Sequence, residues 1–83
     1  MGRAQQLIEQ RNIIAARSML ERAVDSGHPL ALFALAETYD PNQLAAWGTV
    51  GTQGDPAQAR ELYEKALAGG MTEARARLAA LQP

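Results

Sequence analysis

Few side chains in this 83-residue chain have the types and spacing that catalysis requires. The single histidine, His28, follows Gly27 where a helix is expected to end. A general base needs a nucleophile or a substrate proton within hydrogen-bond reach, and no motif places Ser18 or Ser26 against this imidazole. The chain has no cysteine, which excludes disulfides and the common zinc sites. We therefore interpret His28 as a helix-turn residue.

Two further patterns suggest chemistry only weakly. The spacing of Gly48, Gly51 and Gly54 suggests a phosphate-binding loop, but no Lys-Ser or Lys-Thr follows and no strand pattern precedes them. We interpret this stretch as a connector. Glu61 and Glu64 place two carboxylates on one predicted helix, and nothing near them in the sequence favours general acid–base catalysis. We expect no catalytic residue, no enzymatic activity, no metal and no cofactor.

The composition predicts one small helical domain covering residues 1–83. Alanine occurs 17 times and leucine 10 times, against 5 isoleucines and valines together, which favours helices over sheets. The formal net charge of −1 gives no field that would attract nucleic acid. The longest apolar run, Leu30–Ala36, is too short to cross a bilayer, so we expect a soluble protein, cytoplasmic or periplasmic, without membrane insertion.

Capping residues and apolar spacing locate the helices that carry these side chains. Asn12 fits an N-cap, Gly27 a left-handed C-cap, and Pro29 the first position of a helix. Asp40 and Asp55 each precede a proline and stand three residues before a glutamine, the pattern of a capping box. The predicted helices span residues 3–11 (a partial leading helix), 13–25, 29–39, 41–47 (short and inserted), 56–68 and 72–81.

An internal repeat relates the two halves of the chain. Residues 13–36 align with residues 56–79 at an offset of 43, with eight identities in 24 positions, where about two or three are expected by chance. We interpret residues 12–39 as repeat 1, residues 40–54 as an inserted short helix and glycine-rich loop, and residues 55–82 as repeat 2. The identities are Ala16/Ala59, Arg17/Arg60, Glu21/Glu64, Ala23/Ala66, Gly27/Gly70, Ala31/Ala74, Leu35/Leu78 and Ala36/Ala79.

The second unit carries a family resemblance. The run Asp55-Pro56-(x)2-Ala59-Arg60-(x)-Leu62-Tyr63-Glu64-Lys65-Ala66-(x)3-Gly70-(x)3-Ala74 resembles a Sel-one-like repeat, a relative of the tetratricopeptide repeat. The first unit fits less tightly, and residues 3–10 resemble the second helix of a truncated preceding repeat. The inserted segment 40–47 departs from the family pattern. HEAT and armadillo arrays also admit a period of 43, but the Tyr-Glu-Lys-Ala…Gly pattern argues against them.

The resemblance implies an all-α fold, an α-solenoid of antiparallel helical hairpins with about five helices plus the short inserted one. Members of the family act as adaptors or scaffolds, with no catalytic residues. Alanines at matching places allow two helices to approach closely. We expect a core that contains Leu7, Ala16, Leu20, Ala23, Ala31, Leu35, Ala59, Tyr63, Ala66, Ala74 and Leu78.

Charged pairs at i,i+4 spacing are the first candidates for partner contacts. Arg17/Glu21 and Arg60/Glu64 occupy matching places in the two units. Such pairs contribute only a few tenths of a kcal/mol on an exposed helix, so they are typical of a solvated face. The alternative is that they line the rim of a concave groove formed by the first helices. Two more such pairs are Glu61/Lys65 and Glu73/Arg77.

Trp47, on the inserted helix, has two interpretations. It could fold back over the helix that carries Phe33 and cover the open end of the hairpin. It could instead be an exposed anchor, because tryptophan is enriched in binding hot spots.

We therefore expect a non-catalytic protein–protein interaction module or scaffold, a fragment of a larger protein, that binds a protein or peptide partner. The alternative is a self-associating regulatory or accessory domain, a homo-oligomer, within an envelope-associated or signalling protein. An array of two units leaves its end helices partly uncovered, which favours stacking on a neighbour.

Overall fold

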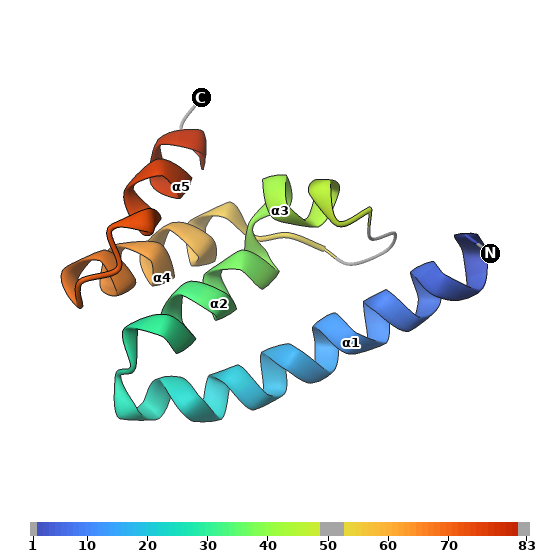
Figure 1. The fold of residues 1–83 in the computed structure, drawn as a ribbon, viewed down its shortest axis with the longest axis horizontal. Coiled ribbons are helices and arrows are strands. Elements are labelled where there is room, and N and C mark those ends of the chain that lie inside the picture. The colour runs from blue at the N-terminus through green and yellow to red at the C-terminus, as the bar shows by residue number, and fades with distance from the viewer. Residues whose placement is uncertain (1, 49–52, 82–83) are drawn as a thin grey trace.

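The computed structural model describes residues 2–48 and 53–81, with side chains from Ile13 onward (Figure 1). All regular elements in these segments are helical, which confirms the predicted all-α class. They are α1 (Gly2–Ala23), the 3-10 turn η1 (Val24–Ser26), α2 (Pro29–Tyr39), α3 (Pro41–Ala46), α4 (Pro56–Ala68) and α5 (Glu73–Leu81). None of the helices in the described segments is both long and apolar enough to span a membrane.

The helix starts at Pro41 and Pro56 follow the predicted caps in part. The Asp40 carboxylate accepts a hydrogen bond from the backbone N–H of Asn42 at 2.9 Å, and the Asp55 carboxylate accepts one from the backbone N–H of Gln58 at 3.2 Å. The returning half of the second capping box is not formed, because the backbone N–H of Asp55 donates to the Tyr39 carbonyl at 2.8 Å. This bond ties the entry of α4 to the end of α2.

Left-handed glycines close both helical hairpins. Gly27 has a φ of 72°, as predicted, and Gly70 has a φ of 108° at the matching place 43 residues later. Only glycine adopts this region at low cost, so both turns depend on the missing side chain.

The predicted break at Asn12 is wrong. A single helix, α1, runs from Gly2 to Ala23, so the partial leading helix at 3–11 and the first helix of repeat 1 are continuous. The described residues therefore form four longer helices, with α3 as a short fifth. No proline or glycine lies between Arg3 and Ala23, so an asparagine alone does not end the helix.

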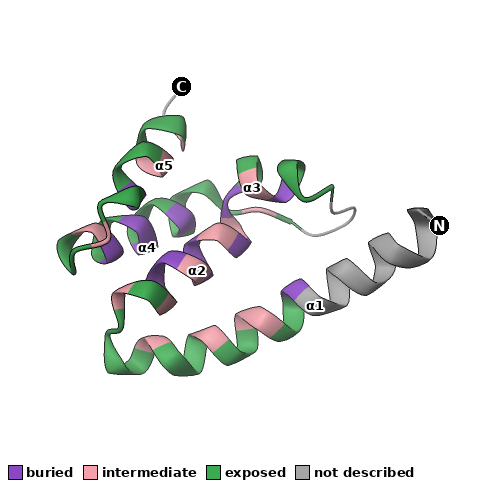
Figure 2. Cartoon of the chain, viewed as in Figure 1, coloured by how far each residue is buried: buried purple, intermediate pink, exposed green. Residues whose placement is uncertain are grey.

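The helices pack in the order α1, α2, α4 and α5, with α2 between α1 and α4 (Figure 1). Figure 2 shows the buried residues concentrated on the facing sides of α2 and α4. The core cluster consists of Leu32, Phe33, Leu35, Ala36, Ala59, Leu62, Tyr63, Ala66 and Ala74.

The expected core is confirmed for the second unit more fully than for the first. Buried as predicted are Leu35, Ala59, Tyr63, Ala66 and Ala74. Half-buried are Ala16, Leu20, Ala31 and Leu78. Ala23 is exposed, so its placement in the core is wrong. Among the described residues α1 packs mainly on α2, whereas α4 packs on both α2 and α5. Leu7 lies outside the residues whose side chains are described.

Gly69 allows the close approach of α4 to the start of α2. A Cβ at this position would lie 2.6 Å from Cγ of Pro29, while its φ of −86° is open to any residue. We expect Gly69→Ala to lower the free energy of unfolding by about 1–3 kcal/mol through this contact alone. Urea unfolding measures the change. In a Pro29→Ala background, which lacks the obstructing Cγ, the cost should be smaller; equal costs in both backgrounds would contradict the steric explanation.

Candidate functional site

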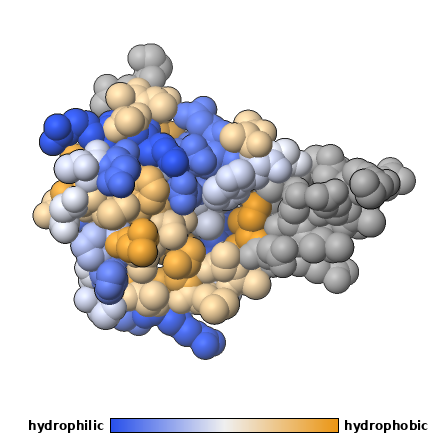
Figure 3. All heavy atoms as spheres, viewed as in Figure 1, coloured by the Kyte–Doolittle hydropathy of each residue, from blue (hydrophilic) through white to orange (hydrophobic). Residues whose placement is uncertain are grey.

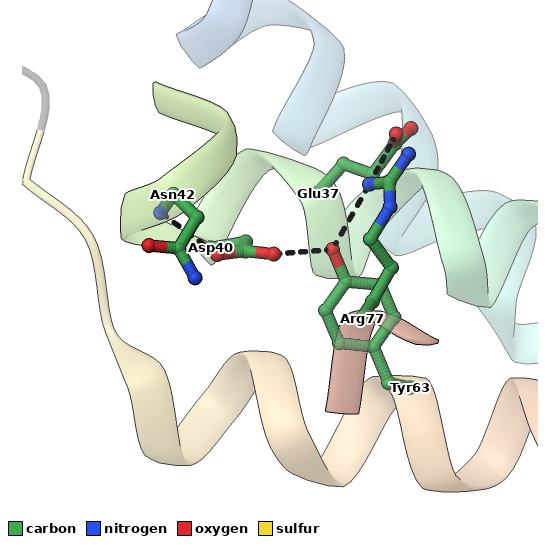
Figure 4. A network of polar contacts seen from close by, with 5 residues as sticks. All are labelled: Glu37, Asp40, Asn42, Tyr63 and Arg77. Carbon is green, nitrogen blue, oxygen red and sulfur yellow. Dashed lines mark hydrogen bonds and ion pairs between the residues drawn. The ribbon is translucent and has the colours of Figure 1, made fainter. Parts of the chain in front are cut away.

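A buried pair of polar side chains joins the two halves of the chain (Figure 4). The hydroxyl of Tyr63, in the middle of α4, donates to a carboxylate oxygen of Asp40 at 2.7 Å. Both residues have an exposed fraction of 0%. The second carboxylate oxygen of Asp40 caps α3 through Asn42. One side chain therefore starts α3 and also holds α4.

Arg77 brings α5 to the same network. Its guanidinium contacts a carboxylate oxygen of Glu37 on α2 at 2.8 Å and donates to the Tyr63 hydroxyl at 3.4 Å (Figure 4). It also lies 5.0 Å from the centre of the Phe33 ring. The predicted Arg77 pairing with Glu73 is therefore wrong, because Arg77 reaches across to α2.

The electrostatics of this network support a structural role. Burial and then the hydrogen bond to Asp40 raise the pKa of Tyr63, so the phenol stays protonated and donates. Burial lowers the pKa of Arg77, but its contacts with Tyr63 and Glu37 outweigh burial and raise it overall, so the cation is retained. A substrate has no access to Asp40 or Tyr63, since both are fully buried.

Arg17 forms a second polar cluster, at the other side of α2. Its guanidinium donates to the side chain of Thr38 at 3.3 Å, to the carbonyl of Thr38, and to the carbonyl of Gln53 at 3.1 Å. It also stacks over the Tyr39 ring, 4.1 Å from the ring centre. Arg17 thus joins α1, the end of α2 and the segment that leads into α4.

The predicted rim charges separate into two kinds. Glu21 accepts a hydrogen bond from the Tyr39 hydroxyl at 3.3 Å, so Arg17 and Glu21 meet on Tyr39. Burial and the Glu21 carboxylate raise the pKa of Tyr39. Arg60 and Glu64, at the matching places, are exposed on α4. The two repeated pairs therefore differ: the pair on α1 contacts Tyr39, and the pair on α4 is exposed to solvent.

The predicted Glu61/Lys65 pair is confirmed. Its charged atoms lie 3.5 Å apart, on an exposed face.

Trp47 lies at the end of α3 and is 40% exposed. The buried residue of α3 is Leu44, with an exposed fraction of 4%. Of the two interpretations of Trp47, the structure favours an exposed side chain over a cover for the core. It lies beyond the C-terminal end of α2, away from the surface described next.

An apolar groove runs between the end of α1 and the start of α2. Its volume is about 420 Å³, and it is lined by Leu20, Ala23, Ser26, His28, Leu30, Ala31 and Ala34. Leu30 is 60% exposed, and Met19, one residue before Leu20, is 71% exposed. Figure 3 shows hydrophobic residues gathered over α1 and α2 on the viewed face. We did not predict this groove, although the apolar run from Leu30 was the available signal.

Within the described residues, no group of three or more histidine, aspartate or glutamate side chains is placed to hold a metal ion. Comparisons with protein-family models, with curated proteins and with solved structures found no match. The resemblance to Sel-one-like repeats therefore stays a prediction, carried by the residues alone.

The raised pKa of Tyr63 predicts a loss of stability at alkaline pH. An unfolded chain begins to lose its tyrosine protons near pH 10. The folded protein holds the Tyr63 proton to higher pH, so this stability is complete below about pH 10 and falls as the pH rises through the folded pKa. Unfolding in urea from about pH 8 to 11 measures the slope. Tyr63→Phe should flatten it more than the matched control Tyr39→Phe; an unchanged slope in Tyr63→Phe would contradict this explanation.

The two repeat-related arginines predict different mutational costs. Arg17→Ala removes hydrogen bonds to Thr38 and Gln53, so we expect the free energy of unfolding to fall by about 1–2 kcal/mol. Arg60→Ala removes an exposed side chain and should leave stability unchanged within error. Thermal and urea unfolding of both variants check this, and similar costs at the two positions would be the contrary result.

Proposed function

We propose that the chain is a non-catalytic protein-interaction module, built as a short α-solenoid of Sel-one-like helical hairpins. Three observations support the repeat architecture. The sequence repeats at an offset of 43, the hairpins α1–α2 and α4–α5 occupy matching places, and both turn at a left-handed glycine. Residues Asp40 and Tyr63, whose types could do chemistry, are buried and paired with each other, which supports a role without catalysis.

The apolar groove between α1 and α2 carries the proposal. Contiguous apolar surface on a soluble domain marks interaction sites, whereas single exposed apolar residues do not. Here the half-buried Leu20, Ala31 and Ala34 form the floor, and Leu30 stands exposed at the rim. Because the lining contains no lysine, arginine or carboxylate, the matching partner surface is apolar. A groove between two helices accepts the apolar face of a helix from a protein or peptide.

The predicted charged residues and Trp47 contribute less to the proposed partner site than the groove does. Arg60 and Glu64 are exposed on α4 and available to a partner. Arg17 and Glu21 are engaged with Tyr39, so partner binding through them would have to break these contacts. Trp47 offers a separate exposed aromatic contact near the other end of α2.

Site-specific photocrosslinking tests the groove. A photoreactive phenylalanine analogue replaces Leu30 in one variant and Glu64 in another, and each is expressed in the source cell. We expect position 30 to capture a distinct protein that mass spectrometry identifies. Calorimetry with that purified protein should then show binding that Leu30→Glu weakens at least about tenfold. The control Ile14→Glu, which changes an equally exposed apolar residue outside the groove lining, should bind like the original chain.

Two results would overturn this assignment. Crosslinks to a distinct protein from position 64 alone would move the binding site to the charged face of α4. Equal affinities for the Leu30→Glu and Ile14→Glu variants would show that the groove does not contact the partner.

A further inference from the structure

The internal repeat allows the same helix position to be compared in two environments. An offset of 43 places α1 over α4, and Ala16, Met19 and Ala23 over Ala59, Leu62 and Ala66. The three α4 residues have exposed fractions of 0%, 8% and 0%, in the core that α4 shares with α2. On α1, Met19 is 71% exposed, Ala23 is also exposed and Ala16 is half-buried. Thus α1 leaves open most of the face that α4 buries.

The second helices of the two units, α2 and α5, also differ in which residues are buried. The offset places Leu32, Phe33 and Ala36 of α2 over Arg75, Ala76 and Ala79 of α5. The α2 residues are buried, and the ring of Phe33 lies 5.5 Å from that of Tyr63 on α4. The α5 residues are all exposed. Thus α5 leaves open the face that α2 presents to α4.

These two open faces are the two halves of an interface that already exists inside the molecule. We propose that a second copy of this chain is the occupant: α5 of one copy packs on α1 of the next, as α2 packs on α4. The proposal names a partner for the face of α1 that carries Met19 and Ala23, and so rests on the proposed interaction function.

The contact joins two different faces, α5 of one copy and α1 of the other. In a pair, the first copy therefore keeps its α1 face open and the second keeps its α5 face open. Such a head-to-tail interface extends into chains unless its rotation closes a ring. Arg75 and Ala76 replace the apolar Leu32 and the aromatic Phe33, which makes this contact weaker than the internal one. We expect reversible, concentration-dependent association of the kind that small interfaces give.

Sedimentation velocity from about 10 µM to about 1 mM, a range that brackets weak association, tests the proposal on the full chain. The sedimentation coefficient should rise with concentration. Met19→Glu and Ala79→Glu each place a charge on one of the two faces, and each should raise the dissociation constant at least about tenfold. Ile14→Glu is the matched control, since Ile14 is 61% exposed and its repeat equivalent, Ala57, is exposed as well. Circular dichroism verifies that all three variants fold.

Mixing the two defective variants tests the head-to-tail geometry. The Met19→Glu copy keeps its α5 face and the Ala79→Glu copy keeps its α1 face, so the mixture should form pairs that grow no further. A strictly monomeric original chain, association of Met19→Glu equal to that of Ile14→Glu, or a mixture that stays monomeric would each overturn the proposal.

The variant Leu30→Glu distinguishes failure of the self-association proposal from failure of the groove assignment. Leu30 and its repeat equivalent Glu73 are both exposed, so Leu30→Glu should leave self-association intact. If the chain is monomeric and Leu30→Glu still weakens partner binding, the interaction function holds and the proposed self-association is wrong.

Discussion

The hydrogen bond between Tyr63 and Asp40 is the interaction on which the arrangement of the helices depends. A buried polar group without a partner costs several kcal/mol, so each of these side chains needs the other. Asp40 lies where α2 ends and α3 begins, and Tyr63 lies in the middle of α4. Their contact therefore sets how α4 crosses the end of α2, and Arg77 adds α5 to the same point. The two hairpins are joined by a specific polar contact as well as by apolar packing.

Repeat-related positions differ in this protein because their neighbours differ. Arg17 is held by the end of α2 and the segment before α4, whereas Arg60 has solvent around it. Met19 is exposed where Leu62 is buried, because in the described residues α2 packs on that face of α4 and no helix covers Met19. The faces of α1 and α5 that lack an internal neighbour are the ones that we propose for contact with a second copy, whereas the groove that we propose for a partner lies between α1 and α2.

Local signals in the sequence predicted most of the helices. The caps at Asp40 and Asp55 and the turn at Gly27 are decided within a few residues, and the structure has them in place. The break at Asn12 failed because an N-cap residue within a helical pattern does not stop the helix. The Tyr63 network and the groove at Leu30 depend on which helices become neighbours, and local patterns such as caps and apolar spacing do not show that.

A double-mutant cycle between Tyr63→Phe and Asp40→Ser measures the coupling between these two side chains. Serine keeps a side-chain cap for α3 but is too short to reach Tyr63, so the cycle isolates the contact between the helices. Urea unfolding of the four proteins should give a coupling free energy of about 1.5–3 kcal/mol, the range for a hydrogen bond to a charged group. Coupling within about 0.3 kcal/mol of zero would show that the two changes act independently and that the Tyr63–Asp40 hydrogen bond does not hold the helices together.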